Sequence, residues 1–396
     1  MGQRTNSGGL LDPEHVIGRD DLVARLWRRL ETQSVMITAE RRMGKTSIVR
    51  DKMGKQTPDG WKLIYLDLSR CTTPLEFVQT LLEHSRPLLG GAKNAKLRFG
   101  EFLNRLAGAE IDLGIGLKLP ENLATHWKSL LLSLAEDLAA MKSPRLLLVF
   151  DELPLMLDAI KRRAKDGLDG EAVVMEILDT LRAIRQENDL RMIYTGSLGL
   201  HHVLTVLRDQ GYQNDPANDM EVVDLKPLTP ANAQSLATRL LAGEGLACPD
   251  PDAVAAHLAR VTDGIPFYIQ KTVSAMAYEE VPATVEGVDK CVAHRLIDLT
   301  DPWKLDYFVD RIDTHYPARL KPVAQAILDQ LAAKDDQSLT ELFEGLDPNS
   351  VETNPDEVRK TLSLLGLDHY ITTDGETFRF RIGFIQRVWR ARRRQS

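Results

Sequence analysis

Short apolar runs alternate with longer, helically spaced segments over the first part of the chain. The apolar runs, each predicted to be a strand, cover residues 34–38, 61–68, 145–150, 191–195 and 221–225. The intervening segments, such as 171–186, place apolar residues at the three- and four-residue spacing of an amphipathic helix. Runs such as 146–150 are apolar throughout, as expected for strands covered on both faces of a parallel sheet. The pattern predicts an α/β fold with a doubly wound parallel sheet.

The helix and strand at 171–195 follow the strand at 145–150, and this order favours a sheet in which 191–195 lies between 34–38 and 145–150.

Two further patterns lie in the long segment between the second and third strands. Residues 99–106 are amphipathic, and 111–119 alternate around two glycines, which predicts a small inserted strand or hairpin.

Helical spacing dominates the rest of the chain. Thr229 and Pro230 open a series of short predicted helices at 230–242, 252–261, 266–278 and 284–298, followed by an aromatic-rich connector. The last part predicts a winged helix, with helices at 322–333, 338–346 and 355–366, a hairpin across Asp374-Gly375 and a closing helix at 384–394. We therefore expect a flexible arm at 1–14, an α/β domain at 15–227, a small helical domain at 228–300, called the lid below, the connector at 301–320 and a winged-helix domain at 321–396.

The segment between the first strand and the next helix predicts a phosphate-binding loop. Residues 39–46 read AERRMGKT, which matches G-x-x-x-x-G-K-[ST] except that Ala39 replaces the first glycine. In such a loop, backbone N–H groups and a helix N-terminus surround nucleotide phosphates. Lys45 would reach the β- and γ-phosphates, and Thr46 would hold Mg²⁺. The expected nucleotide-binding residues are Ala39, Glu40, Arg41, Arg42, Met43, Gly44, Lys45, Thr46 and Ser47. The alternative is that G-K-T occurs here by chance.

A second motif supports the phosphate loop. The strand at 145–150 ends in Asp151-Glu152. An aspartate at this place can contact the Mg²⁺ shell, and a glutamate directly after it can polarise the attacking water. Thr195 and Ser197 follow the neighbouring strand and are candidates for contact near the γ-phosphate, although both could be ordinary turn residues. The expected catalytic residues are therefore Lys45, Glu152, Thr195 and Ser197, with Thr46 and Asp151 as metal-binding residues.

Composition and charge narrow the classes of function. The net charge of −7 argues against a protein that coats nucleic acid over its whole surface. Three distant cysteines form no metal-ligand spacing and fit a reducing compartment. No apolar run reaches membrane-spanning length and the N-terminus lacks the apolar core of a signal peptide, so we expect a cytoplasmic protein without a membrane partner.

The motifs in their order resemble the archaeal-type ATPases of the STAND/AAA+ group, relatives of the origin-recognition ATPases. The stretches that carry the resemblance are HVIGRD, AERRMGKTS, LLLVFDEL, YTGS, DGIPFY and FRFRIGFIQRVWR. The resemblance implies that ATP and Mg²⁺ are bound, that Gly18 and Arg19 lie against the adenine and ribose, and that Pro266 faces the base. The alternative interpretation of both stretches is purely structural. The first is then a loop that enters a helix at Asp20, and the second a helix that begins at Pro266. Two features depart from the family pattern: Ala39, and the lack of an obvious lid arginine beside the γ-phosphate. The missing arginine suits a slow, switch-like ATPase.

Three functions follow from these predictions. The first is an ATP-driven switch in which nucleotide rearranges the lid and winged helix and promotes partner engagement or self-assembly. The second is a DNA-binding regulator or loader with a mainly structural nucleotide, and the third is a protein-interaction scaffold. A terminal basic cluster favours DNA contact and comprises Arg379, Arg381, Arg387, Arg390, Arg392, Arg393 and Arg394. Two observations oppose DNA contact. Asp356 and Glu357 are acidic and lie at the start of the third helix of the winged-helix domain, which is a poor charge pattern for a helix that enters a DNA groove. Arginines at a chain end are also often only solvated.

Overall fold

The computed structural model describes residues 2–89, 99–101, 104, 119, 121–141, 143–163, 169–346 and 354–393. Contacts divide the chain into two compact units. Unit 1 comprises Met1–Gly18, Ala39–Gly44 and Leu225–Ser396, and unit 2 comprises Arg19–Thr38 and Lys45–Asp224. The phosphate loop is therefore shared, with residues 39–44 in unit 1 and Lys45 and Thr46 in unit 2. Each unit is described by itself.

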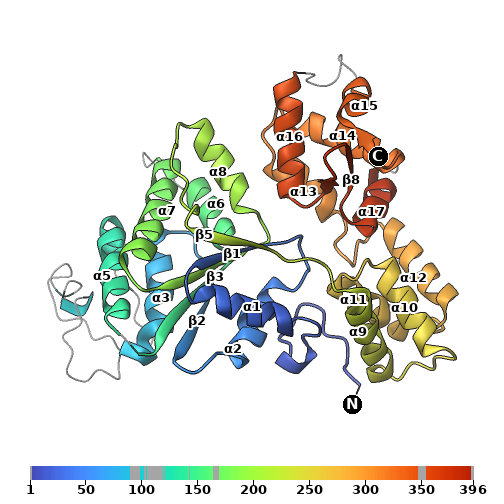
Figure 1. Ribbon diagram of the computed structural model, residues 1–396, viewed down its shortest axis with the longest axis horizontal. Helices are drawn as coiled ribbons and strands as arrows, with labels where there is room; N and C mark the ends of the chain where they lie inside the picture. Colours follow the sequence, from blue (N-terminus) through green and yellow to red (C-terminus); the bar gives the residue numbers. More distant parts are fainter. Residues whose placement is uncertain are drawn as a thin grey trace. The chain divides into compact units, whose positions relative to one another are not determined.

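Unit 2 contains the predicted parallel sheet (Figure 1). Its strands are β1 (Ser34–Thr38), β2 (Trp61–Asp67), β3 (Arg145–Asp151), β4 (Arg191–Tyr194) and β5 (Met220–Asp224). They lie in the order β2-β3-β4-β1-β5, and every pair in this sheet is parallel. The predicted fold class is confirmed, and so is the position of β4 between β3 and β1. The carboxyl ends of β1, β3 and β4 consequently meet at one edge of the sheet, where a ligand binds in open α/β sheets.

Helices cover both faces of this sheet because its strands are apolar on both sides. One face packs against α3 (Pro74–Leu89), α5 (Trp127–Ala139), α6 (Leu153–Arg163), α7 (Gly170–Glu187) and α8 (Leu200–Asp209), and their leucines and aromatics form one continuous core with alternate strand residues such as Leu148 and Phe150. The opposite face carries α1 (Asp20–Leu30) and the helical turns η2 (Ser47–Lys52) and α2 (Met53–Lys55) (Figure 1). A 3-10 turn, η3 (Glu121–His126), precedes α5.

Unit 1 contains a helical segment that begins as predicted. Thr229 caps α9 (Pro230–Gly243), because its side chain accepts a hydrogen bond from the Asn232 N–H, and Pro230 occupies the first turn. The helices α10 (Pro251–Val261), α11 (Pro266–Tyr278) and α12 (Val285–Ile297) follow, and the last is capped by Thr284. The helices α9, α10 and α12 begin at an aspartate or threonine cap, whereas α11 begins at Pro266 without a side-chain cap.

The last part of unit 1, residues 321–393, is called the C-terminal module below. Its elements are α14 (Lys321–Ala333), β6 (Gln337–Ser338), α15 (Leu339–Glu344), α16 (Pro355–Leu367), β7 (Ile371–Thr373), β8 (Thr377–Phe380) and α17 (Gly383–Arg393). The strands form an antiparallel sheet in the order β6-β8-β7. The order of helix, strand, two helices, hairpin and helix is typical of a winged helix. Ser338 and Glu341 form a capping box at α15, and Asn354 caps α16, because its side chain accepts a hydrogen bond from the Asp356 N–H.

The two segments that flank these elements, the predicted arm and the predicted connector, both contain short helical stretches. The predicted flexible arm contains a short turn, η1 (Pro13–His15), and its first residues are bound to the helical segment. The Gln3 N–H donates to the Arg239 carbonyl, and the Thr5 N–H and hydroxyl donate to Glu244. Backbone and hydroxyl groups make these bonds, which is why apolar periodicity does not reveal them. The predicted connector contains a helix, α13 (Tyr307–His315), whose Phe308 and Ile312 are buried.

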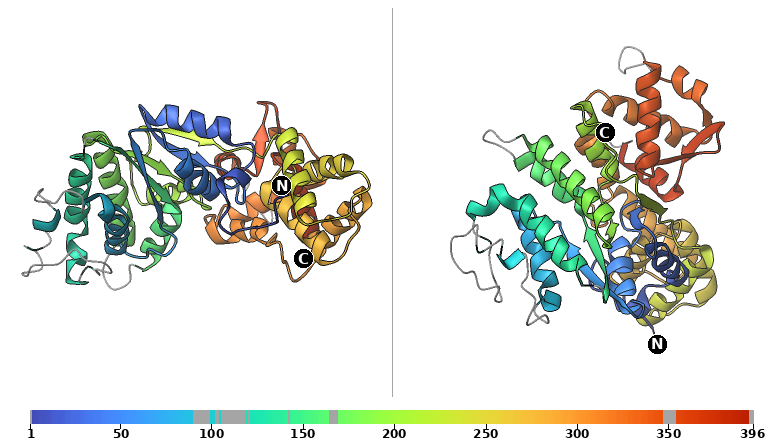
Figure 2. Two further views of the ribbon diagram at one scale, coloured as in Figure 1. Left: turned by 90° about the horizontal axis from the view of Figure 1, so that it is seen from below. Right: turned by 60° about the vertical axis from the view of Figure 1, so that its left-hand side comes forward.

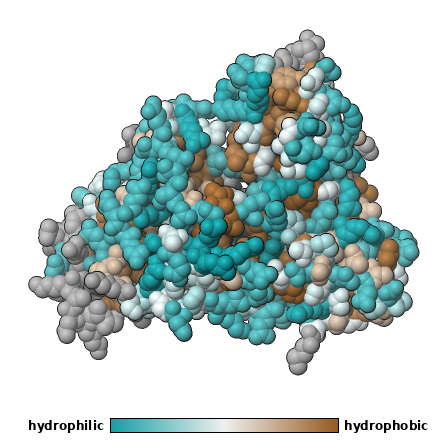
Figure 3. All heavy atoms as spheres, viewed as in Figure 1, coloured by the Kyte–Doolittle hydropathy of each residue, from teal (hydrophilic) through white to brown (hydrophobic). Residues whose placement is uncertain are grey.

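Most of the predicted strand at 111–119 and most of the amphipathic segment 99–106 lie outside the described residues. Within the described part of the chain, no helix is long and apolar enough to cross a membrane. The visible surface in Figure 3 is mostly hydrophilic, with small separate hydrophobic patches. Two further views in Figure 2 show the helices that cover the sheet of unit 2 and those of unit 1.

Candidate nucleotide site

The phosphate loop runs from the end of β1 to a helix, as predicted. Its backbone turns at Arg42 and Gly44, where φ is 73° and 87°. Glycine adopts this conformation at little cost, so the second fixed glycine of the motif has a local reason, whereas Arg42 adopts it at a cost in strain. Helical backbone begins at Lys45, and Ser47 opens η2. A helix N-terminus therefore follows the loop directly, the arrangement that favours anions.

Two motifs separated by more than a hundred residues meet in unit 2. The Thr46 hydroxyl donates to Asp151 at the end of β3, with 2.7 Å between Thr46 Oγ1 and Asp151 Oδ2. A third group, which the sequence did not suggest, contacts the same oxygen, because the Tyr65 hydroxyl lies 2.8 Å from Asp151 Oδ2. Burial, followed by the neighbouring Asp151 carboxylate, raises the pKa of Tyr65, so this hydroxyl remains a proton donor. The cluster places two hydroxyls and a carboxylate beside Lys45, an oxygen-rich set that suits a hard divalent cation.

Glu152 is held next to this cluster in an unusual backbone conformation. Its φ is 59°, and such strain at a non-glycine residue is often retained at functional sites. The Ser197 N–H and hydroxyl both donate to Glu152 Oε2, at 2.8 and 2.9 Å. Burial raises the pKa of Glu152, and the two hydrogen bonds from Ser197 and the nearby Lys45 oppose that rise. A partly desolvated carboxylate with a raised pKa has the properties of a general base.

Thr195 lies at the tip of β4, between the Asp-Glu pair and Ser197. Its N–H donates to the Phe150 carbonyl, and its carbonyl accepts from the Leu153 N–H, so its backbone joins β4 to the end of β3. Its side chain is buried, and its hydroxyl oxygen is one of the buried polar atoms that have no hydrogen-bond partner among the described residues. A buried hydroxyl without a partner is costly, so a ligand that supplies one fits this position.

The first half of the phosphate loop has partners within unit 1. Glu40 is 1% exposed, and both of its carboxylate oxygens accept from Arg311 Nη1 of α13, at 3.2 and 3.3 Å. The other terminal nitrogen of Arg311 donates to the Asp368 carboxylate at the end of α16, which also accepts from the Tyr316 hydroxyl at 2.6 Å. Burial alone would lower the pKa of Arg311, but Asp368 and Glu40 raise it well above its usual value. We call Glu40, Arg311 and Asp368 the buried triad.

The two arginines of the loop lie on aromatic rings of unit 1. The Arg41 guanidinium carbon is 4.4 Å from the centre of the Tyr307 ring, and that of Arg42 is 4.1 Å from the centre of the Phe267 ring. Arg42 also donates to the Tyr268 hydroxyl at 3.3 Å and to the Trp303 carbonyl. Burial lowers the pKa of Arg42. Together with Glu40, these contacts anchor the loop segment Ala39–Gly44, in which Ala39 and Met43 are also buried.

The residues that the family resemblance assigned to the base and ribose lie in both units. Gly18 belongs to unit 1, where φ is 68° and a Cβ would lie 2.5 Å from the Asn232 side chain, so glycine is required there. Arg19 belongs to unit 2, is buried, and has its pKa lowered by that burial to about 10. The adjoining Asp20 accepts from Lys52 of η2 at 3.0 Å, which lowers the pKa of Asp20. Pro266 starts α11, as its alternative interpretation also predicted.

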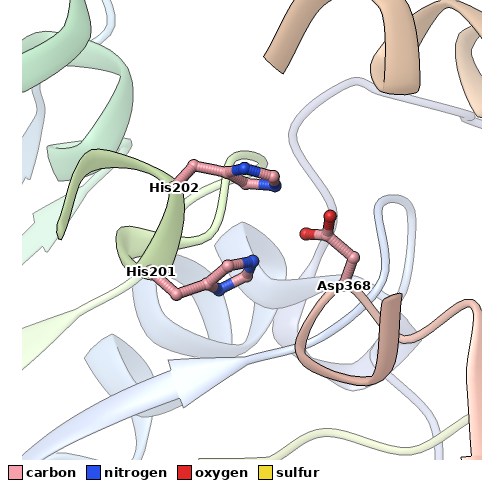
Figure 4. A group of neighbouring side chains, drawn as sticks. All are labelled: His201, His202 and Asp368. Atoms are coloured by element: carbon pink, nitrogen blue, oxygen red, sulfur yellow. The ribbon is translucent and has the colours of Figure 1, made fainter. Parts of the chain in front are cut away.

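Figure 4 draws two histidines of unit 2 together with an aspartate of unit 1. His201 and His202 lie in the first turn of α8, with their ring centres 4.5 Å apart. Asp368 is the member of the buried triad described above, where Arg311 and Tyr316 donate to its carboxylate. The hydrogen bonds within unit 1 account for the position of this carboxylate, and we assign no site to the three residues.

The C-terminal arginines have partners inside unit 1. Arg387 and Arg390 donate to the carbonyls of Val261 and Ala332. The others bind carboxylates or a histidine: Arg379 with Asp336, Arg381 with His369, Arg392 with Asp301 and Asp306, and Arg393 with Asp329. Arg394 lies outside the described residues. The cluster that the sequence presents as a basic patch is therefore largely used to attach α17 to its neighbours.

The fold is a doubly wound parallel sheet with the phosphate-loop motif after its first strand, followed by helices and a terminal helix–hairpin module. Among solved structures, it is similar to a Walker-type ATPase of Pyrococcus abyssi, with a TM-score of 0.64 and 14% identity over 97% of this chain and 99% of that one. It is also similar to the ORC2 protein of Aeropyrum pernix, solved as ADPNP–ADP complexes, with a TM-score of 0.52 and 14% identity over 97% and 96% of the two chains. These similarities confirm, at the level of the fold, the predicted resemblance to archaeal origin-recognition-type ATPases.

No protein-family model matches the chain, and no curated protein matches it in sequence. Function therefore has to be argued from the site itself.

Proposed function

We propose that this protein is an ATP-binding, slowly hydrolysing switch of the AAA+/STAND type. The observation that carries the proposal is the 2.7 Å hydrogen bond from Thr46 to Asp151, because it joins the phosphate-loop motif to the Asp-Glu motif in one cluster. A single short motif of this kind can match a sequence by chance. Two chance matches, however, have no reason to meet at the carboxyl edge of a parallel sheet. The solved ADPNP and ADP complexes of the similar ORC2 protein support ATP as the nucleotide.

Each residue of the cluster has a role that its geometry supports. Backbone N–H groups at the start of the helix and the Lys45 ammonium bind the phosphates. The Glu152 carboxylate accepts a proton from the attacking water, and Ser197 orients that carboxylate through two hydrogen bonds. Thr195 presents its buried hydroxyl to the terminal phosphate.

The donor set at Thr46 and Asp151 fits Mg²⁺, since both groups supply oxygen and the Asp151 carboxylate is buried. When bound, the cation would neutralise phosphate charge. Thr46 would hold it through the hydroxyl oxygen while the hydroxyl proton still points to Asp151.

The buried triad supports a switch rather than a simple hydrolase. It links Glu40 of the phosphate loop to Arg311 of α13 and, through Arg311, to Asp368 of the C-terminal module. A change in the loop when nucleotide binds is therefore coupled to groups that hold this module, and the coupling is reciprocal. We propose that ATP state controls engagement of a protein partner or self-assembly through this link.

Replacing Lys45 by alanine tests the nucleotide site. MgATP at about 100 times its dissociation constant should stabilise the wild-type protein by about 2.7 kcal/mol, and Lys45→Ala should lose most of that effect because the main side-chain charge for the phosphates is gone. Thermal unfolding with and without MgATP measures the difference. Lys128→Ala, which removes an exposed lysine paired with Glu176, is the control and should keep the wild-type response. A shift that is absent in the wild type, or identical in Lys45→Ala, would contradict the proposal.

A DNA-binding regulator or loader is the alternative function, suggested by the topology of the C-terminal module. The described arginines of α17 and the hairpin already bind carboxylates and carbonyls, so phosphate contact would have to break these bonds. We therefore expect no salt-sensitive DNA binding by the arginine cluster. Titration of a labelled duplex at about 50 and about 200 mM salt, with and without ATP, measures this. A steep fall in affinity with salt would favour the DNA-binding function instead, and ATP-independent protein binding would favour a scaffold.

A further inference from the structure

Tyr65 is a residue that neither the phosphate loop nor the Asp-Glu motif includes. It lies on β2, two residues before the end of the strand, and β2 pairs in parallel with β3. Tyr65 and Asp67 share one face of β2 because side chains alternate along a strand. In the register of the two strands Asp67 lies opposite Asp151, so the tyrosine reaches towards Asp151 from one side.

The contacts of Tyr65 specify one oxygen of Asp151. Its hydroxyl donates to Oδ2 at 2.8 Å, and the Thr46 hydroxyl donates to the same oxygen at 2.7 Å. Two donors on one oxygen fix both the rotation of the carboxylate and its tilt. Oδ1 is the oxygen that neither hydroxyl contacts.

The ring of Tyr65 is also held in place. The Arg50 guanidinium carbon lies 6.0 Å from its centre, and Arg50 is itself fixed by two hydrogen bonds to Asp51, at 2.6 and 3.0 Å. Arg50 belongs to η2, the turn that follows the phosphate loop. The tyrosine thus lies between the helical turn and the Asp-Glu strand.

We propose that Tyr65 is a positioning residue that fixes the Asp151 carboxylate so that Oδ1 faces the cation site beside Thr46. The inference rests on the proposed function, because a positioning role has meaning only if Mg²⁺ and nucleotide bind here. Groups that orient a metal-binding carboxylate are typically worth about 10- to 100-fold in metal affinity or activity. In this role Tyr65 acts through the Asp151 carboxylate, so its effect should appear in the metal dependence of turnover.

Tyr65→Phe tests this role, because it keeps the ring and removes only the hydroxyl. The half-saturating Mg²⁺ concentration for ATP hydrolysis by the full chain should rise about 10-fold. Binding of a fluorescent ATP analogue in EDTA should stay at the wild-type value. The control is Tyr212→Phe, which also removes a tyrosine hydroxyl from a carboxylate, that of Asp179 at 2.7 Å, away from the cluster.

The outcomes separate three cases. An increased Mg²⁺ requirement in Tyr65→Phe alone supports the proposal. Equal losses of thermal stability in both variants, with unchanged Mg²⁺ dependence, would make Tyr65 a structural residue and overturn it. If the wild-type protein shows no Mg²⁺-dependent nucleotide binding, the proposed function fails and the positioning role fails with it. If the wild-type protein depends on Mg²⁺ and Tyr65→Phe has the same Mg²⁺ dependence, only the positioning role is overturned.

Discussion

Glu152→Gln should bind MgATP as tightly as the wild-type protein and lose about 99% or more of its turnover, since general-base catalysis contributes about 10²- to 10⁴-fold. The side chain keeps its length and one acceptor oxygen, so Ser197 can still donate to it as it does to Glu152 Oε2. Only the ability to take a proton from water is removed. Single-turnover hydrolysis and equilibrium binding, measured on the same preparation, separate the two effects.

The pH dependence of turnover gives the same experiment a second readout. Burial raises the pKa of Glu152 above its ordinary value, so the catalytic carboxylate form is lost as the pH falls through that raised value. Wild-type turnover should therefore decline on the acidic side, and Glu152→Gln should lack this decline. If Glu152→Gln retains turnover and its turnover still declines at acidic pH, another group is the base. If the wild-type protein binds ATP without hydrolysing it, the protein is a nucleotide-held switch rather than an enzyme.

The strands and their order could be predicted because both depend on local signals. Each buried strand of the parallel sheet is a run such as Leu146–Phe150 with polar residues at its ends, and alternating strands and helices restrict the topology. The phosphate loop and Asp151-Glu152 were also visible, since each is a short motif next to such a run. Their meeting at Thr46 and Asp151 follows from the sheet order itself.

The groups that the sequence did not reveal are held by long-range polar contacts. Tyr65 looks like any aromatic residue of an inner strand, and its bond to Asp151 depends on the register between β2 and β3. Glu40 looks like a variable loop position, and the arginine that binds it lies 271 residues later. Charge patterning cannot pair residues at such separations, which is also why the paired terminal arginines resembled an open basic patch.

A self-assembling ATPase can supply an arginine finger from one subunit to the nucleotide of its neighbour, and Arg182, Arg185 and Arg191 are the candidates that follow the Asp-Glu motif in the sequence. The three arginines have different environments. Arg185 is buried in unit 2 and held by Asp219, the Pro216 carbonyl and Tyr194. Arg191 donates to the Leu30 carbonyl and pairs with Asp189. Arg182 has a buried Nε without a partner among the described residues, so the guanidinium is at least partly turned into the protein. None of the three presents a feature that selects it as a finger.

Arg311→Met should destabilise unit 1 by about 3–5 kcal/mol, the cost of removing one partner from a buried ion pair. Methionine is close in length and keeps the packing, but Glu40 and Asp368, which are both almost fully buried, would lose their shared cation. Two desolvated carboxylates would then remain without a cation between them. Chemical unfolding followed by peptide-resolved hydrogen exchange measures the loss and locates it in unit 1.

The matched control is Arg185→Met, which removes a buried guanidinium from Asp219 in unit 2. Both variants should lose stability, but of the two arginines only Arg311 contacts the phosphate loop, through Glu40. Hydrogen exchange at residues 39–44 should therefore rise in Arg311→Met and stay unchanged in Arg185→Met, with a parallel loss of ATP-dependent stabilisation in the first variant alone. Equal exchange at the loop in the two variants would show that the triad only packs unit 1, and the link from the nucleotide loop to the C-terminal module would have to be abandoned.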